Sequence, residues 1–256
     1  MKRSITIFSL IVFYTFLFIP GMTQNKIVHE ESGVIIHFQT DRNMFPENWV
    51  GGSINGQAES LKESEYERSK KIILKALDKY PPEVLEDNLK EIYLLNSLEF
   101  YDQGYGGTNS NYNVYLVNSG ESDGYSDEYV EQLFHAEFSS ILLRNYSNPL
   151  FESRWEKVND EGFEYGDGGV LEIKNGTAGT DYSADYFKHG FLYQYAMSGM
   201  ENDFNSISKN LFCPNTKFWK EAYKYKKLRL KIDATIKFYN NIDETFTKEY
   251  FKSLKE

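Results

Sequence analysis

The stretch of sequence that most constrains the fold runs from Ser126 to Tyr146 and reads SDEYVEQLFHAEFSSILLRNY. Ser126 is suited to cap a helix, and Asp127 and Glu128 would place negative charge at the positive end of the helix dipole. Apolar residues then recur every three or four positions, which predicts one helix with an apolar face. These apolar residues are Val130, Leu133, Phe134, Phe138, Ile141 and Leu142.

Glu137 interrupts this apolar face, four residues after Leu133 and four before Ile141. A carboxylate at such a position is costly unless it is paired, hydrogen-bonded or protonated. One interpretation is a structural Glu that hydrogen-bonds a neighbouring segment. The other is a general base, because zinc peptidases place H-E-x-x-H on a helix, with both His on one face. Aligned on Glu137, the two His positions of that motif hold Ala136 and Ser140.

The rest of the chain predicts a small sheet followed by a mainly helical C-terminal half, which is an α+β class. Strands are expected at residues 33–38, 91–98 and 112–117. Helices are expected at residues 60–80, 83–89, 218–239 and 242–254, and another is expected to begin at Ser198 or Glu201. Loops are expected at residues 43–59 and 118–124, a glycine turn at 103–108, and a long irregular segment at 148–180.

Residues 1–23 are typical of a secretory signal, with Lys2 and Arg3 before an apolar run from Ile5 to Ile19. We expect cleavage after Thr23 and export to the periplasm or the outer cell surface. The apolar run is short for a membrane-spanning helix, so no stable transmembrane span is expected after cleavage. A strand-and-loop segment, 24–59, and one larger domain, 60–256, would follow. The oligomeric state is not readable from the sequence.

The net charge of −10 argues against binding to nucleic acid, which requires clustered Lys and Arg. The sequence has one Cys, Cys213, so it cannot form an internal disulfide. Stability therefore depends on the core, which 20 Tyr and 19 Phe residues predict to be rich in aromatic side chains.

A second informative stretch, YAMSGMENDFNSI at residues 195–207, follows the FHAEFSSIL of residues 134–142. Together with KYPPEVL, GYGGT and NVYLV in the same order before them, these stretches resemble a family of zinc-binding metallopeptidases secreted by Bacteroidetes. That family is distantly similar to the lethal-factor type of gluzincin. The resemblance covers roughly residues 60–255 and implies a zincin-like fold.

The resemblance implies a role for five positions of this chain. Glu137 would stand at the general-base position and Tyr195 at the position of the Tyr that stabilises the oxyanion. The three metal ligands would stand at the positions of Ala136, Ser140 and Asn202, and none of these side chains is a zinc ligand of the usual kind. The resemblance therefore predicts a degenerate metal site, in which no zinc cofactor is bound.

Three hypotheses follow. The first is a secreted metallopeptidase-like protein without zinc or catalysis, which binds a peptide or glycan or holds a partner protein at the cell envelope. Strand addition at Tyr112, Val114 and Leu116 would then bind an extended peptide. The second is an active zinc metallopeptidase with displaced ligands, for which the candidates are His135, His189 and Glu201. The third is a different hydrolase, in which Glu137 works with a second carboxylate, either Asp203 or Glu201.

Overall fold

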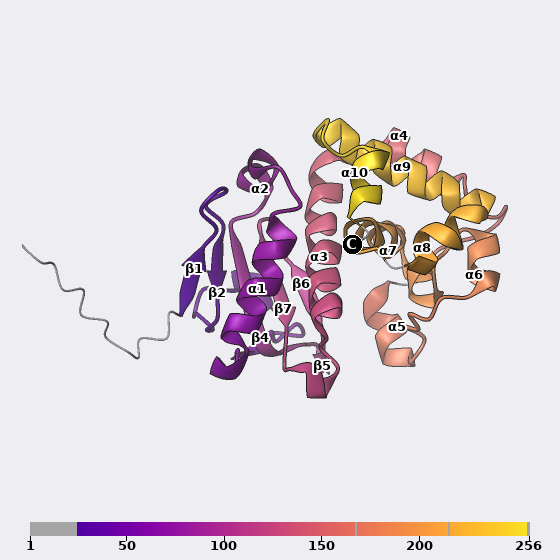
Figure 1. Ribbon diagram of the computed structural model, residues 1–256. Helices are drawn as coiled ribbons and strands as arrows, with labels where there is room; N and C mark the ends of the chain where they lie inside the picture. Colours follow the sequence, from indigo (N-terminus) through magenta and orange to yellow (C-terminus); the bar gives the residue numbers. More distant parts are fainter. Residues whose placement is uncertain (1–24, 167, 215, 255–256) are drawn as a thin grey trace, which may run out of the picture.

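The computed structural model describes residues 25–166, 168–214 and 216–254, and these form a mixed sheet with helices packed against it (Figure 1). The strands lie in the order β1-β2-β4-β7-β6. The central strands β2, β4 and β7 are parallel, whereas β1 and β6 run antiparallel to their neighbours. The bounds are β1 (Lys26–Val28), β2 (Ile35–His37), β4 (Glu91–Phe100), β6 (Gly107–Asn109) and β7 (Asn113–Val117). Two further strands, β3 (Gln57–Ser60) and β5 (Gln103–Gly104), pair with the second half of β4.

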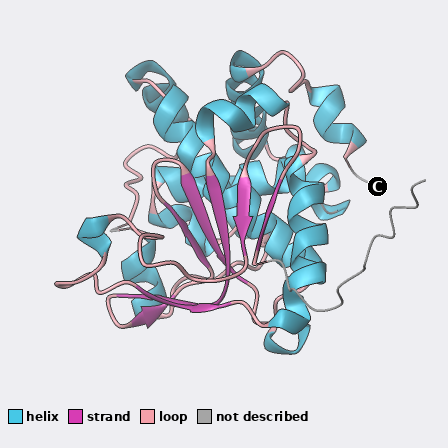
Figure 2. Cartoon of the chain, turned by 90° about the vertical axis from the view of Figure 1, so that its left-hand side faces the viewer, coloured by secondary structure: helices cyan, strands magenta, loops and turns pink. Residues whose placement is uncertain are grey.

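Most helices lie on one side of the sheet, and Figure 2 shows the strands in front of them. The α-helices are α1 (Tyr66–Leu77), α2 (Pro82–Asn88), α3 (Asp127–Tyr146), α4 (Pro149–Glu156), α5 (Gly169–Asn175), α6 (Ala184–His189), α7 (Met200–Phe212), α8 (Thr216–Lys220), α9 (Lys226–Ile242) and α10 (Lys248–Ser253). Short 3-10 helices lie at Glu47–Trp49, Glu63–Glu65, Glu121–Asp123, Gln194–Ser198 and Ala222–Lys224. The expected α+β class, with a small sheet and a mainly helical C-terminal half, is confirmed.

The helix α3 lies at the centre of the molecule, between the sheet and the C-terminal helices (Figure 1). It begins as expected, because the Ser126 hydroxyl accepts a hydrogen bond from the Tyr129 backbone N–H at 3.2 Å. It is buried on more than the one apolar face that the sequence predicts, however. Glu131 is only 3 % exposed and forms ion pairs with Lys75, at 3.0 Å, and with Lys79. The helix therefore carries a buried carboxylate, Glu131, in addition to Glu137, and two lysines neutralise its charge.

The central strands are buried on both faces, as is typical of parallel strands. Along β4, Ile92 and Leu94 belong to the main core, whereas Tyr93 and Leu95 belong to a smaller cluster on the opposite face. The smaller cluster also contains Met44, Leu98, Phe100, Tyr115 and Val117. The two faces of the sheet therefore contact two separate apolar clusters.

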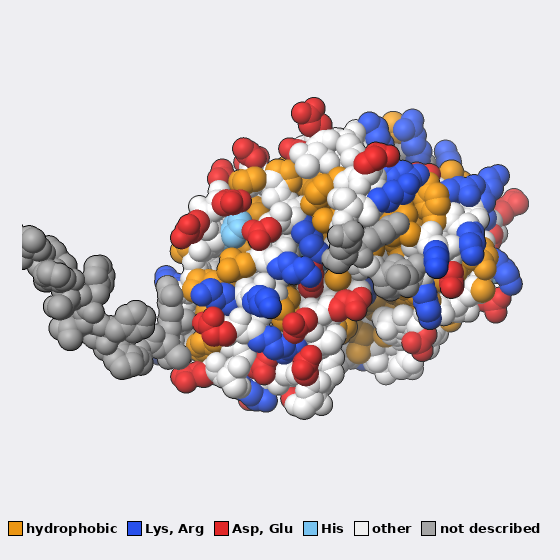
Figure 3. All heavy atoms as spheres, in the orientation of Figure 1, with side chains coloured by type: hydrophobic (Ala, Val, Ile, Leu, Met, Phe, Trp, Pro, Cys, Tyr) orange, Lys and Arg blue, Asp and Glu red, His pale blue; other side chains and the backbone are white. Residues whose placement is uncertain are grey.

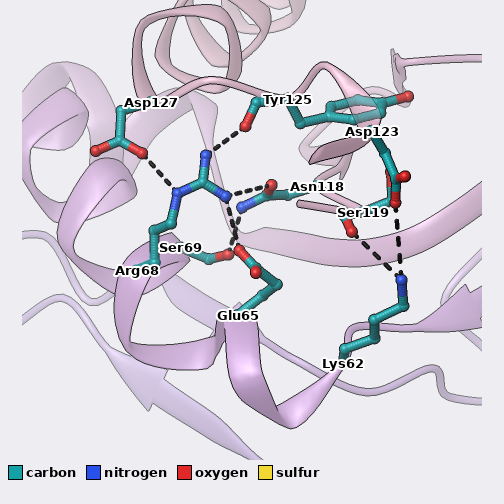
Figure 4. Close-up of polar contacts among 9 residues, drawn as sticks. All are labelled: Lys62, Glu65, Arg68, Ser69, Asn118, Ser119, Asp123, Tyr125 and Asp127. Atoms are coloured by element: carbon teal, nitrogen blue, oxygen red, sulfur yellow. Dashed lines mark hydrogen bonds and ion pairs between the residues drawn. The ribbon is translucent and has the colours of Figure 1, made fainter. Parts of the chain in front are cut away.

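Arg68 on α1 fixes the connection between β7 and α3 (Figure 4). Its guanidinium donates to Asp127 at 2.6 Å, to Glu65 at 2.7 Å and to Asn118 at 3.0 Å. A further donor reaches the backbone oxygen of Tyr125. Because Asp127 is the first residue of α3, this network sets where the central helix begins.

Several predicted boundaries are wrong, and most errors concern polar segments that tertiary pairing orders. The expected loop at 43–59 contains most of β3, which forms by pairing with β4. The expected glycine turn at 103–108 contributes to β5 and β6, and the irregular segment at 148–180 contains α4 and α5. The expected helix at 60–80 is shorter, and the one at 218–239 is divided into α8 and α9. The helix expected at 242–254 is only α10.

The segment 24–59 contributes β1, β2 and most of β3 to the same sheet as the rest of the chain. The predicted signal at 1–23 lies outside the described residues. Within the described ranges, no helix is long and apolar enough to cross a membrane. Lys and Arg side chains gather over α8 and α9 on the face drawn in Figure 3, although the chain as a whole is acidic.

Candidate functional site

A cleft of about 940 Å³ lies between α3, α7 and the strand β6. The helices α3 and α7 form its walls, and Tyr105 to Gly107 form its edge at the sheet. The residues of interest that line it are Gly107, Tyr129, Ala136, Glu137, Tyr195, Asn202, Asn205 and Lys209. The cleft is open rather than filled by side chains, so it has room for a ligand.

Glu137 is half-buried in the wall of this cleft. Its carboxylate accepts a hydrogen bond from the Asn109 side chain on β6 at 2.8 Å. Burial raises the pKa of Glu137 to about 7, and the negative charge of Glu201 adds to the rise while the Asn109 hydrogen bond opposes it. Gly107 permits this close approach, because a side chain there would meet Glu137 at 3.2 Å. The hydrogen bond and the position in the cleft fit both interpretations of Glu137, so neither is excluded.

We expect Glu137→Gln to stabilise the protein at pH 8 and to change little at pH 4. The folded-state pKa of about 7 exceeds the ordinary value of 4.5, so the wild type loses stability as the pH rises through this window. The gain at pH 8 should be about 2 kcal/mol. Urea unfolding at both pH values measures it, with Glu128→Gln at an exposed position of the same helix as the control. An equal effect at both pH values would contradict the burial argument.

Tyr195 and Asn202 stand on the same side of the cleft, beside the start of α5. A side chain at Gly169 would lie 2.3 Å from the Tyr195 hydroxyl and 3.1 Å from the Asn202 amide nitrogen, so only glycine fits there. The Asn202 amide donates to the Ser198 hydroxyl at 2.8 Å. Burial raises the pKa of Tyr195, and the nearby charge of Glu137 adds to this. Glu137 and Tyr195, which lie far apart in the sequence, therefore line one cleft.

The three positions at which the resemblance places metal ligands lie on the facing helices α3 and α7. Ala136 has no donor atom, the Ser140 hydroxyl accepts a hydrogen bond from Asn205 at 2.7 Å, and the Asn202 amide is bound to Ser198. A catalytic zinc ion requires three ligands of the His, Glu, Asp or Cys type. The side chains at these positions do not fit a zinc ion.

The three displaced-ligand candidates are not brought together. His135 is fully buried, bonds the Tyr80 hydroxyl at 2.9 Å and stacks on Phe212, and burial lowers its pKa to about 4. His189 is bound to Asp160 at the end of α6. Glu201 is exposed on the first turn of α7 and does not line the cleft. Among the described residues, no group of three or more His, Cys, Asp or Glu side chains could hold a metal ion.

Asp203 is also unsuited to the acid/base pair that the third hypothesis requires. Its side chain is fully buried and forms an ion pair with Lys231 at 2.5 Å. It also accepts hydrogen bonds from Trp155 at 3.0 Å and from Tyr165 at 2.7 Å. These contacts join α7 to α4 and α9, which is a structural role.

The prediction that residues 112–117 form the peptide-binding edge of the sheet is wrong, because the next strand, β6, lies outside them. Val114 and Leu116 of β7 are fully buried in the main core, and β7 is paired on both sides, by β4 and β6. Tyr112 is 44 % exposed, but it lines a second pocket that shares no lining residue with the cleft, and the Lys90 ammonium lies over its ring. Within the described part of the chain, β6 is the edge strand beside the cleft. The sequence missed it because GGTN lacks the apolar alternation of a strand.

Sequence reasoning also missed Asn109 on β6, and Asn205 and Lys209 on α7. The helix α7 carries the predicted site residue Asn202. Helical spacing could have found the last two, because Asn205 and Lys209 follow Asn202 by three and seven residues and share its face of α7. Asn109 follows the GYGGT motif directly, but only the pairing of β6 with β7 places it against Glu137.

The fold resembles that of a known protein. A search of solved structures matched a crystal structure from Bacteroides caccae ATCC 43185, described as a "putative zinc-binding metallo-peptidase". The TM-score is 0.57 at 14% sequence identity, over 88% of this chain and 85% of that chain. No protein-family model and no curated protein matched the sequence. At this identity the likeness shows the fold alone, and the expected zincin-like, metallopeptidase-like fold is confirmed.

Proposed function

We propose that this protein is a metallopeptidase-like protein that has lost zinc binding and catalysis and uses its cleft to bind an extended peptide at the cell envelope. The observation that carries the proposal is the contrast within the cleft. Glu137 and Tyr195 line it together with Ala136 and Asn202, which stand at two of the three positions that the resemblance assigns to metal ligands. The third position holds the buried Ser140. The gluzincin subtype, the degenerate motif and secretion to the periplasm or outer surface are parts of the same proposal.

The edge strand β6 supports a peptide as the ligand. In an antiparallel pair, alternate residues direct their backbone N–H and C=O groups toward the same neighbour. Gly106 and Ser110 bond to β7, so the backbone groups of Gly107 and Asn109 point to the open edge. An extended peptide can pair with such an edge without any metal ion. The cleft of about 940 Å³ then holds the peptide's side chains.

A blocking substitution tests this use of the cleft. Ala136→Phe places a ring in the cleft, and we expect it to lower the capture of a random heptapeptide pool at least about tenfold. Ala184→Phe, at an exposed position on α6, is the matched control and should capture as the wild type does. Mass spectrometry of the eluted peptides measures both capture and cleavage.

Three results would contradict the proposal. If Ala136→Phe captures as many peptides as the wild type, the cleft is not the binding site. If the wild type cleaves the peptides and a chelator stops it, the protein is an active metallopeptidase. No capture of any peptide by the wild type would reject peptide binding altogether.

A further inference from the structure

Lys209 is a charged cleft residue whose chemistry the proposed function leaves unexplained. It lies on α7, seven residues after Asn202, and lines the same cleft. The other charged lining residues apart from Glu137, which are Glu128, Asp181 and Lys217, are exposed at the rim, whereas Lys209 is half-buried. Its ammonium lies 5.2 Å from the centre of the Tyr193 ring, and no carboxylate among the described residues forms an ion pair with it.

An unpaired ammonium group that is half-buried in the wall of the cleft destabilises the protein when no ligand is bound. Burial lowers the pKa of Lys209, although Tyr129 and Glu137 act in the opposite direction. On the central helix, by contrast, the buried Glu131 carboxylate is paired with Lys75 and Lys79. An anionic group of a ligand would supply the missing partner for Lys209.

The direction of β6 indicates which part of a peptide would reach Lys209. A side chain at Gly106 would meet Tyr129 and Leu133 of α3, whereas Asn109 bonds Glu137 and Arg144 further along that helix. The strand β6 and the helix α3 therefore run in the same direction. A peptide that pairs antiparallel with β6 would start near Asn109 and end near Gly106 and Tyr129.

The facing helices place Lys209 at the level of Glu137, the residue that a side chain at Gly107 would meet. The helix α7 runs antiparallel to α3, because Asn205 contacts Ser140 whereas Phe212 stacks on His135. Lys209 lies between these two contacts along α7, which places it opposite the turn of α3 between His135 and Ser140. An antiparallel peptide whose last residue lies beside Gly107 would therefore bring its C-terminal carboxylate to the level of Lys209.

We propose that Lys209 binds the C-terminal carboxylate of a peptide that lies antiparallel to β6, so that the cleft selects free peptide C-termini. This inference rests on the proposed peptide-binding function. It adds a specificity that β-strand pairing alone does not provide, because backbone hydrogen bonds do not distinguish a carboxylate from an amide.

A mixed-pool experiment tests the inference. Immobilised protein is offered equal amounts of one random heptapeptide pool with a free C-terminal carboxylate and the same pool with a C-terminal amide. Because a hydrogen bond to a charged group is among the stronger ones, we expect about tenfold enrichment of the free acids. Lys209→Met should bring the ratio close to one while amide peptides are captured as before. Lys70→Met, at the surface of α1, is the matched control and should keep the enrichment.

The outcomes separate the inference from the proposed function. Equal capture of acids and amides by the wild type, or an unchanged preference in Lys209→Met, would overturn the role of Lys209 while peptide binding stands. No capture of either pool would overturn both. Capture of both pools that disappears in Lys209→Met would assign Lys209 a structural role and overturn the proposed specificity.

Discussion

Replacing Ala136, Ser140 and Asn202 together by His, His and Glu is expected to create a variant that keeps about one zinc ion per chain after dialysis. Residues 136 and 140 are one turn apart on α3 and share a face, and Asn202 lines the same cleft from α7. The 2.7 Å contact between Ser140 and Asn205 shows that the two helices are close enough to share a metal ion.

The expected gain in zinc affinity is on the order of 10⁴-fold, because loss of outer-shell partners alone already costs roughly 10- to 100-fold. Isothermal titration with zinc measures it. The double variant Ala136→His/Ser140→His, which lacks the third ligand, is the control and should bind much more weakly. If the triple variant binds no more zinc than the wild type, the three side chains do not meet at one point. The positions of this chain have then been matched wrongly to the metal ligands of the family.

Lys231→Met is expected to destabilise the fold by about 3–5 kcal/mol, because it leaves the Asp203 carboxylate buried without its cation. Both side chains are fully buried, and the Lys231 ammonium also lies 3.9 Å from the centre of the Phe191 ring. Urea unfolding measures the loss. The substitution acts on the fold as a whole, because Asp203 connects α7 to α4 and α9.

The double variant Asp203→Leu/Lys231→Met separates the ion pair from simple packing. Removing both charges should recover a large part of the lost stability, since replacing a buried pair by apolar residues is often neutral. If the double variant is as unstable as Lys231→Met alone, the packing of these side chains and not the unpaired carboxylate determines the stability. That result would contradict the structural role given to the pair.

The elements around the site could be predicted where the sequence pattern is local. The helix α3 is predictable because Ser126 caps it and apolar residues recur along it, and β7 is predictable because NVYLV is a run of mainly apolar and aromatic residues. The strand β6 was not found, because its strand conformation comes from pairing with β7 and not from its own residues. The short helix α4 also carries a local signal, since Asn148 caps it and Pro149 occupies its first turn.

The site could be predicted only in part. Sequence order placed Glu137 and Tyr195 correctly in one cleft, but it gave no means of telling which way a side chain points from a buried helix. His135 stands beside Glu137 in the sequence, yet it faces the aromatic core around Tyr80 and Phe212. Asp203 likewise follows Asn202 and points to Lys231 instead of the cleft. Neighbouring residues on a helix face different directions, so only the packing decides which of them line the site.

The zinc content of the purified wild-type protein tests the central claim most directly. The protein would be dialysed against zinc, then against buffer, and its metal measured by atomic emission, with the triple variant as the positive control. The account predicts that the wild type keeps far less than one zinc ion per chain. About one zinc ion per wild-type chain, lost on Glu201→Gln or His189→Ala, would contradict it and make the protein a metallopeptidase with displaced ligands.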